Sequence, residues 1–243
     1  MFSFNGEIYC FYTPYTNAGA EFTLYKLVNN TWTALTSKIT NCSAAGRQDA
    51  LVGFNGKIHL VYVSNHWCFD GTNFTKLSTI PAYLYQVCVF NGQLIGCQES
   101  KTEVYVWDET TDTWSIYPVV APGNSSRPFV CNDELYFVYY SSGYKIAKVI
   151  DGVAVTVAAF PNTVYYNPVV ANNKLYATAR LTSSASEQIY NLFEFDPSNN
   201  SLRALGYLPC RVYRHLWVHD NQVRLLLGDT DGFCDVIAFE VTE

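Results

Sequence analysis

The carboxylates of this sequence, the first candidates for general acid–base chemistry, fall into two groups. One group recurs in a repeated setting, just after an apolar run and at the start of a polar turn: Asp70, Asp108, Asp151 and Asp196. A repeated Asp at such a place is typical of an Asx turn, in which the side chain bonds to nearby backbone. A glycosidase needs two non-equivalent carboxylates facing each other across a pocket. The candidates for that role lie outside the repeated setting: Glu99, Glu187, Asp229 and Asp231. We assign no catalytic residue from the sequence.

Histidine and cysteine, the usual transition-metal ligands, show no ligand spacing. The four His are scattered, with His59 inside an apolar run and His66, His215 and His219 near the ends of such runs. None of the eight Cys forms a CxxC pair, and we expect all to be reduced. The P-loop, GxGxxG and GxSxG motifs are also missing from the sequence. We therefore expect no metal and no cofactor.

Arginine and tyrosine are the side chains that favour a binding function. These two types are enriched at binding hot spots, because they offer area and hydrogen bonds at little entropic cost. They gather in the longest and least repetitive connections between apolar runs. The candidate ligand-binding residues are Arg47, Arg127, Arg180, Arg211, Arg214, Tyr144, Tyr165, Tyr166 and Tyr213. The simpler interpretation is that such arginines bond to backbone carbonyls and hold the structure together.

Composition and charge exclude some partners. The net charge is −6, with 15 basic against 21 acidic residues, so we expect no nucleic-acid partner. No signal peptide and no apolar run long enough to span a membrane is visible. We expect no membrane insertion, and a chain that is cytoplasmic or assembled into a virion or appendage. The compartment itself stays unknown.

A two-residue turn between apolar runs recurs along the whole chain. In Leu51–Val63 the turn is Asn55-Gly56, and Asn-Gly between such runs is a strong hairpin signal, because a type I′ turn needs positive φ at both central residues. The equivalent pairs are Asn5-Gly6, Asn91-Gly92, Asn132-Asp133, Asn172-Asn173 and Asp220-Asn221. Each pair is followed by a second and a third strand, and five copies then add a short fourth strand.

A four-stranded antiparallel unit of about 40 residues is the signature of a β-propeller blade. We therefore predict an all-β chain, a six-bladed β-propeller in one domain with four-stranded antiparallel blades. The expected blades are approximately 1–36, 47–78, 85–118, 127–159, 167–206 and 214–243. The two-residue turns all fall at one end of the sheets, and we expect them to be too short to build a site. The long connections fall at the other end, which we call the loop-rich end.

The repeating unit resembles kelch repeats. The best match is Val89–Leu94, with sequence VFNGQL, followed by Val104–Trp114, with sequence VYVWDETTDTW. The second strands end without the Gly-Gly pair of standard kelch repeats, so the resemblance is to divergent kelch-like propellers. The segment Asp70–Pro81 followed by Phe-Asn-Gly also resembles kelch-like modules of phage virion and bacterial surface proteins.

The last blade differs from the others because no fourth strand follows its third. We expect it to have three strands and to expose an apolar edge. Asp235 and Glu240 could blunt that edge. The other possibility is a partner strand docked on it by β-augmentation. The residues of this candidate edge are Asp235, Ile237, Phe239 and Val241.

Two functions remain open from the sequence. The preferred one is a non-enzymatic module that binds a protein or a glycan through its loop-rich end, as part of a virion or surface appendage. The alternative is a carbohydrate-active propeller enzyme, either a glycoside hydrolase or a sugar mutarotase or epimerase. Two carboxylates, or an acid–base pair, converging with Arg in a deep pocket at the channel mouth would favour the enzyme. A flat or shallow aromatic surface would favour the binding module.

Overall fold

The computed structural model describes ten stretches of the chain. They are residues 2–12, 22–39, 51–62, 64–98, 101–123, 126–161, 164–180, 190–208, 212–228 and 234–239. All regular structure in them is β, which confirms the predicted all-β propeller of antiparallel blades. None of these stretches contains a helix that is both long and apolar enough to cross a membrane.

The strands form successive antiparallel meanders, which we number as blades in chain order. Blade 1 holds β1 (Phe2–Phe4), β2 (Glu7–Tyr12), β3 (Phe22–Val28) and β4 (Thr31–Ile39). Blade 2 holds β5 (Leu51–Phe54), β6 (Lys57–Tyr62), β7 (Asn65–Phe69) and β8 (Phe74–Lys76). Blade 3 holds β9 (Leu84–Phe90), β10 (Gln93–Gln98), β11 (Glu103–Asp108) and β12 (Thr113–Val120).

The second half of the chain repeats this order. Blade 4 holds β13 (Arg127–Cys131), β14 (Glu134–Tyr140), β15 (Tyr144–Ile150) and β16 (Val153–Ala159). Blade 5 holds β17 (Val164–Ala171), β18 (Lys174–Arg180), β19 (Tyr190–Asp196) and β20 (Ser201–Leu208). Blade 6 holds β21 (Val212–His219), β22 (Gln222–Gly228) and β23 (Cys234–Phe239), so three strands are described for it.

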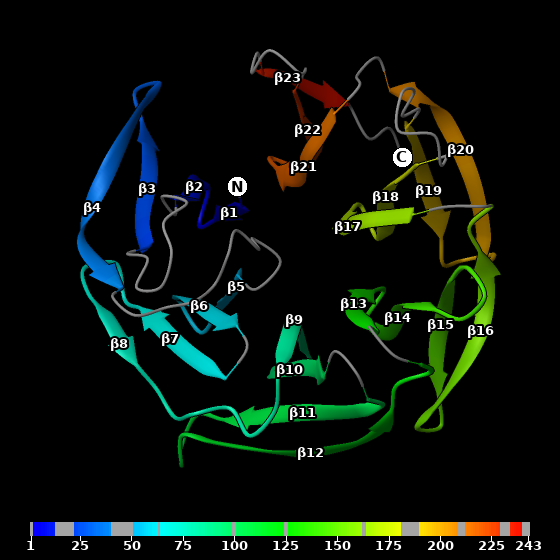
Figure 1. Cartoon of the computed structure of the whole chain (residues 1–243), viewed down its shortest axis with the longest axis horizontal. Helices are drawn as coiled ribbons and strands as arrows, with labels where there is room; N and C mark the ends of the chain where they lie inside the picture. Colours follow the sequence, from blue (N-terminus) through cyan, green and yellow to red (C-terminus); the bar gives the residue numbers. More distant parts are fainter. Residues whose placement is uncertain are drawn as a thin grey trace.

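The blades are arranged in a ring (Figure 1). The first strand of each blade lies nearest the centre, and the fourth strand lies on the rim. Blades 3 and 4 are joined on the rim by a single parallel pairing of Val120 with Val153. The ring brings the first and last blades together, because the Ser3 hydroxyl of β1 lies 3.0 Å from Nδ1 of His219 at the end of β21.

The two-residue turns have the backbone conformation that the sequence predicts. Both central residues of the turn between the first and second strand have positive φ in every blade, from Asn5 (51°) and Gly6 (74°) to Asp220 (49°) and Asn221 (60°). Asn and Asp tolerate this left-handed region better than other residues with a side chain. The turns therefore set the register of all six hairpins.

Three of the recurring aspartates form the predicted Asx turns. Oδ1 of Asp70 accepts the backbone N–H groups of Thr72 and Asn73, both at 2.8 Å. Asp108 and Asp196 accept the N–H group two residues later, at 2.8 and 2.9 Å. The backbone hydrogen bond from Asn73 is the main cause that lowers the pKa of Asp70. These carboxylates stabilise turns as anions.

Apolar side chains fill the spaces between successive blades. The interface of blades 1 and 2 contains Tyr9, Leu24, Ile58 and Phe69, and that of blades 4 and 5 is built around Tyr136, Phe193 and Phe195. Blades 2 and 3, 3 and 4, and 5 and 6 meet through similar clusters. A side chain on either face of a blade is therefore buried against a neighbour, which explains why the strands lack a regular polar alternation.

Gly53 is required by the packing of blade 1 on blade 2. A Cβ atom at residue 53 would overlap carbon atoms of the Phe4 ring. We expect Gly53→Ala to lower the free energy of unfolding by about 1–3 kcal/mol, the usual cost of overpacking a core. Urea unfolding followed by tryptophan fluorescence measures this cost. Adding Phe4→Leu to Gly53→Ala should restore part of the loss, and equal losses in both variants would refute the Phe4 contact as the cause.

Candidate functional site

A pocket of about 370 Å³ lies between the first and last blades, at the end of the ring that carries the two-residue turns. Blade 1 contributes residues from its two turns and the adjacent strand ends, and blade 6 contributes two side chains from β21 and β22. The lining residues are Gly6, Glu7, Ile8, Leu27, Asn29, Asn30, His219 and Arg224. We call this the seam pocket. The turn end, which we expected to be too short to build a site, thus carries a pocket where the turns of blade 1 face strands of blade 6. That a ligand uses it is a proposal.

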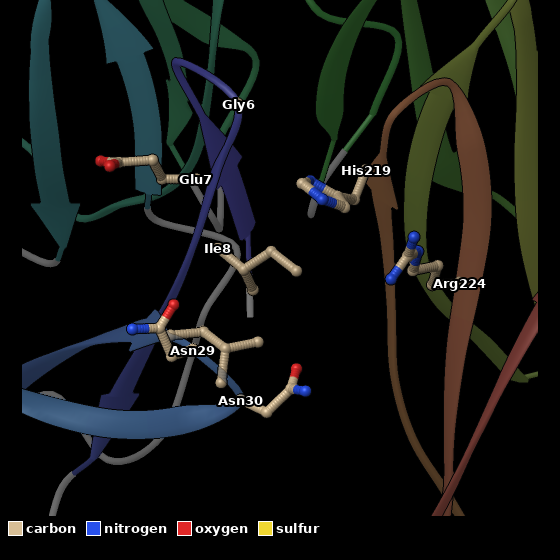
Figure 2. A pocket seen from close by; sticks show the side chains of 8 residues that line it. Gly6, Glu7, Ile8, Asn29, Asn30, His219 and Arg224 are labelled. Atoms are coloured by element: carbon tan, nitrogen blue, oxygen red, sulfur yellow. The ribbon is translucent and has the colours of Figure 1, made fainter.

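Figure 2 shows how the lining side chains are directed. Arg224 and His219 project from blade 6, and Ile8 projects toward them from blade 1. The Glu7 carboxylate points away from them, because it pairs with Lys26 and accepts a 2.7 Å hydrogen bond from the Tyr9 hydroxyl. The charged and titratable groups left facing the pocket are thus the Arg224 guanidinium and the His219 imidazole.

His219 occupies a position that the other five blades fill with apolar side chains. It directly precedes the turn, and its equivalents in blades 1 to 5 are Phe4, Phe54, Phe90, Cys131 and Ala171. Each of these five packs in the apolar cluster shared with the following blade. In the ring the blade that follows blade 6 is blade 1, so His219 places an imidazole where an apolar residue is the rule.

Arg224, the third residue after the turn, is also an exception, because it places a fixed positive charge where the other five blades have uncharged or aromatic side chains. Its equivalents in blades 1 to 5 are Tyr9, His59, Ile95, Tyr136 and Tyr176. Register places Arg224 beside His219 on one face of the hairpin, because Trp217 pairs with Arg224 and His219 pairs with Gln222. Diagonal neighbours of this kind lie within reach of long side chains.

In three blades the residue equivalent to Arg224 is a tyrosine. Its hydroxyl belongs to a charge-neutral triad of one Tyr, one Glu and one Lys. In blade 4 the Tyr136 hydroxyl donates to Glu134 at 3.0 Å, and Glu134 pairs with Lys148 at 2.6 Å. Blade 1 has the same arrangement with Tyr9, Glu7 and Lys26. Blade 5 exchanges the charges, so that Tyr176 donates at 2.8 Å to Glu194 on the neighbouring strand, and Lys174 lies 3.6 Å from that carboxylate. In blade 5 Glu194 also pairs with Arg203 at 2.7 Å and Lys174 lies 3.8 Å from Asp196, so the charges there also balance within the blade.

Blade 6 lacks the anion of this triad. Gln222 stands where blades 1 and 4 have Glu, and Ala238 is paired with Arg224 where those blades have Lys. Arg224 makes one long hydrogen bond, from a terminal amino group to Gln222 Oε1 at 3.4 Å. Its Nε atom is buried without a hydrogen-bond partner. Among the residues that the structure describes, no carboxylate lies within ion-pair distance of Arg224, so its guanidinium has no counter-charge in that part of the chain.

His219 is held from both sides. Its Nδ1 atom lies 3.0 Å from the Ser3 hydroxyl, and its Nε2 atom lies 3.2 Å from Oδ2 of Asp220. The His219 side chain is 12% exposed, whereas that of Asp220 is 70% exposed. The imidazole is therefore fixed in orientation at the wall of the pocket. One titratable side chain, His219, and an arginine thus line the pocket, which is part of the arrangement expected of an enzyme.

A second pair of histidines lies between blades 2 and 3. The Nδ1 atom of His59 and the Nε2 atom of His66 are 2.9 Å apart, and both side chains are fully buried. Trp107 contacts both rings, and Trp114 contacts His66. Burial lowers the pKa of His59 to about 4 and that of His66 to about 3, and in His66 the charge of His59 adds to the effect. The described residues contain no group of three or more potential metal ligands, so we treat this pair as part of the core.

The predicted ligand-binding residues are only partly described. The backbones of Arg127, Arg180, Tyr165, Tyr166, Tyr213 and Arg214 lie at or near strand ends on the loop-rich side, and Tyr144 begins β15 there. Tyr144 packs against the cluster of blades 4 and 5 and contacts the Tyr140 ring. Arg47 and Arg211 lie outside the described residues, as do Glu99, Glu187, Asp229 and Asp231. The role of the nine predicted Arg and Tyr residues in ligand binding stays a prediction.

The predicted partner edge is β23, which pairs with β22 through residues Cys234–Phe239. Asp235, Ile237 and Phe239 lie on this strand, and Val241 lies outside the described residues. Docking of a partner strand on β23 also stays a prediction.

Comparison with known proteins supports the fold. No family model matches the chain. A chain of a nidogen/laminin complex superposes with a TM-score of 0.64 at 11% identity, over 97% of this chain and 89% of that one. A provisionally named 6-phosphogluconolactonase from Bacteroides fragilis gives 0.54 at 15% identity, over 97% and 82%. A provisionally named gluconolactonase gives 0.56 at 11% identity, over 79% and 73%. At these identities the likeness shows a β-propeller and leaves the kelch resemblance a prediction.

Sequence reasoning missed the seam pocket, although a signal for it is present. Aligning the six copies on their turns places His219 and Arg224 in two columns that are otherwise mostly apolar or aromatic. The predicted site residues lie in the long connections, because binding residues usually lie there. The polar residues His219 and Arg224 indicate the pocket, because they mark the blade face on which the repeat has fewer apolar packing residues.

Proposed function

We propose that this chain is a carbohydrate-directed propeller that acts on a small sugar acid, or on its lactone or ester, bound in the seam pocket. The observation that carries the proposal is Arg224, an arginine with unsatisfied donors on a blade face where the repeat elsewhere places apolar or charge-neutral groups. Maintaining such a group costs stability that apolar packing would supply. A bound anion accounts for it.

The pocket suits a ligand of this class in size and chemistry. Its volume of about 370 Å³ falls in the lower part of the range for small-molecule sites, roughly 300–1,000 Å³. The planar guanidinium of Arg224 can hold a carboxylate with two parallel hydrogen bonds. Asn30 and His219 line the same pocket and offer polar partners for hydroxyl groups, and Ile8 and Leu27 offer apolar contact to a sugar ring.

The comparisons agree with this ligand class. Proteins provisionally named 6-phosphogluconolactonase and gluconolactonase share the fold, and their names denote lactones of sugar acids. Such lactones open to a carboxylate, the group that Arg224 is suited to bind. We therefore prefer the carbohydrate-active alternative to a purely protein-binding module, and we keep a divergent kelch-like origin as part of the proposal.

One observation favours a second function, the binding of a protein or a larger glycan at the loop-rich end. Tyr83, Tyr140 and Tyr207 are 59%, 55% and 73% exposed, and all three adjoin connections at that end. Exposed tyrosines are typical of binding surfaces. This function uses the end of the ring opposite the seam pocket, so both functions can coexist.

Isothermal titration calorimetry with a matched ligand panel tests the proposed function. We expect D-gluconate and 6-phosphogluconate to bind with one site per chain, and D-glucose, which lacks the acid group, to bind at least about tenfold more weakly. The reason is that a charge-assisted bidentate pair contributes more than a neutral hydrogen bond, about 1.5–3 kcal/mol. Equal affinity for gluconate and glucose, or no binding of either acid, would refute the assignment.

A further inference from the structure

The groups around His219 favour one tautomer of its imidazole. The Nε2 atom lies 3.2 Å from Oδ2 of Asp220, within ion-pair distance, and a carboxylate at that place favours a proton on Nε2. In a neutral imidazole the other nitrogen then has a free lone pair. The Ser3 hydroxyl lies 3.0 Å from Nδ1, and in this tautomer the hydroxyl is the donor and Nδ1 the acceptor. Ser3, His219 and Asp220 are thus connected as hydroxyl, base and orienting carboxylate.

Ser3 is itself an exception in the repeat. The equivalent residues, two before each turn, are Gly53, Val89, Val130, Val170 and Val218. Four blades place valine there, and Gly53 is explained by the Phe4 ring that lies against it. Ser3 pairs with Ile8, and both Ile8 and His219 line the seam pocket. Ser3, which contacts His219, and Arg224, which lines the pocket with His219, are therefore polar exceptions on the two sides of one seam.

We propose that Ser3 is the nucleophile of an acyl-transfer site in this seam, with His219 as its general base and Asp220 as the positioning residue. A hydroxyl within hydrogen-bond distance of a base that is oriented by a third group is the diagnostic arrangement for such a nucleophile. The proposal rests on the proposed function, because it takes the lactone or ester of the sugar acid as the substrate.

The reaction balances with water as the only co-reactant. The Ser3 oxygen bonds to the carbonyl carbon while its proton passes to His219 Nδ1. The bond between that carbon and the lactone ring oxygen breaks, and the leaving oxygen takes the proton from His219. Water then attacks the acyl carbon, gives a proton to His219, and releases Ser3, which regains that proton. The product is the hydroxy acid, which ionises to the carboxylate.

In this proposal the Arg224 guanidinium stabilises the oxyanion of the reaction and also binds the carboxylate of the product. The negative charge that develops on the carbonyl oxygen is stabilised by preorganised donors. Arg224 lines the pocket and makes one long hydrogen bond, to Gln222, so its terminal N–H groups are the donors proposed for the oxyanion. The carbonyl of the lactone becomes the carboxylate of the product, so the group that binds the product also stabilises the oxyanion.

Covalent labelling of the intact chain tests this proposal. We expect an alkyl fluorophosphonate to add one phosphonyl group per chain, located by peptide mass spectrometry on Ser3. His219→Gln should slow the labelling by at least about tenfold, and Ser3→Ala should abolish it. Ser198→Ala, which alters an exposed turn serine, is the matched control and should label like the wild type. The wild-type measurement alone decides the site, whatever the variants do to folding.

Steady-state and binding measurements separate this proposal from the proposed function. Hydrolysis of D-glucono-δ-lactone, corrected for its spontaneous rate, should fall by at least about 100-fold in Ser3→Ala, while that variant still binds gluconate. Gluconate binding with no adduct on Ser3, or with lactone hydrolysis unchanged in Ser3→Ala, would overturn the nucleophile and leave the pocket assignment intact. If the wild-type chain does not bind gluconate, both the Ser3 nucleophile and the assignment of the seam pocket are overturned.

Discussion

A blade 6 rebuilt with the triad of blades 1 and 4 is expected to lose gluconate binding by about 100-fold or more. The variant combines Gln222→Glu, Arg224→Tyr and Ala238→Lys. It replaces the guanidinium by a phenol, supplies the missing carboxylate and adds the paired lysine. The loss follows because one charge-assisted bidentate contact disappears, at about 1.5–3 kcal/mol, and because the tyrosine ring occupies the pocket. Calorimetry with gluconate measures the loss.

The same variant should fold at least as well as the wild type. The Tyr136–Glu134–Lys148 triad shows that the propeller accepts this combination at the equivalent place in blade 4, with contacts of 3.0 and 2.6 Å. A buried Nε atom without a partner is removed at the same time. Thermal unfolding that is unchanged or shifted upward would accompany the loss of binding. Unchanged gluconate affinity in a folded variant would show that Arg224 is not the anion site.

Two single substitutions in blade 6 refine this result. Gln222→Glu alone keeps Arg224 but places a carboxylate beside it, where Gln222 Oε1 now lies at 3.4 Å. It should weaken gluconate binding by about tenfold, because the guanidinium becomes internally paired. Arg224→Lys keeps the charge but loses the two-pronged geometry and should show an intermediate loss. Full affinity in Gln222→Glu would contradict the role of an unpaired guanidinium.

Acid is expected to destabilise the interface of blades 2 and 3 through the buried pair His59 and His66. Their folded-state pKa values are lowered to about 4 and about 3 by burial, against about 6.5 in an unfolded chain. Between these limits the unfolded state binds more protons, so the free energy of unfolding falls as the pH falls from about 6.5 toward 3. The contribution of the neutral His59–His66 pair to the free energy of unfolding is fully present above pH 6.5. The expected loss is several kcal/mol, a large share of the usual 5–15 kcal/mol.

Urea unfolding at pH 7.5 and pH 4.5 measures this effect. Nearby charges oppose one another, since Glu109 raises and Lys57 lowers the pKa of His59, and Asp112 raises that of His66. The matched variant His59→Leu/His66→Leu keeps an apolar interface against Trp107 and Trp114. It should lose clearly less stability between the two pH values than the wild type. An equal loss in both proteins would assign the acid sensitivity to other groups.

The hairpins of the propeller could be predicted from the sequence because their determinants are local. Positive φ at each two-residue turn is a property of Asn, Asp and Gly themselves. As predicted, a second strand begins directly after each two-residue turn, as in Gln93–Gln98 and Glu134–Tyr140. Repetition then reinforced the weaker copies, in which Gly is replaced by Asp or Asn.

The seam pocket and the histidine pair could not be predicted in the same way, because both depend on long-range register. Ser3 and His219 are 216 residues apart and meet only because the ring closes. His59 and His66 meet because His59 pairs with Cys68 and Val61 pairs with His66, which makes the two histidines diagonal neighbours. Nothing in the local spacing of these residues indicates their contact. The polar exceptions at Ser3, His219 and Arg224 become meaningful once the blades are aligned.

A crystal structure of the chain with D-gluconate tests the central claim most directly. The account predicts the ligand in the seam pocket, with its carboxylate at about 3 Å from the Arg224 guanidinium and its hydroxyl groups near His219 and Asn30. It further predicts that the carboxyl carbon faces the Ser3 hydroxyl. Gluconate bound only at the loop-rich end, or a seam pocket that stays empty at a saturating concentration of gluconate, would contradict the account.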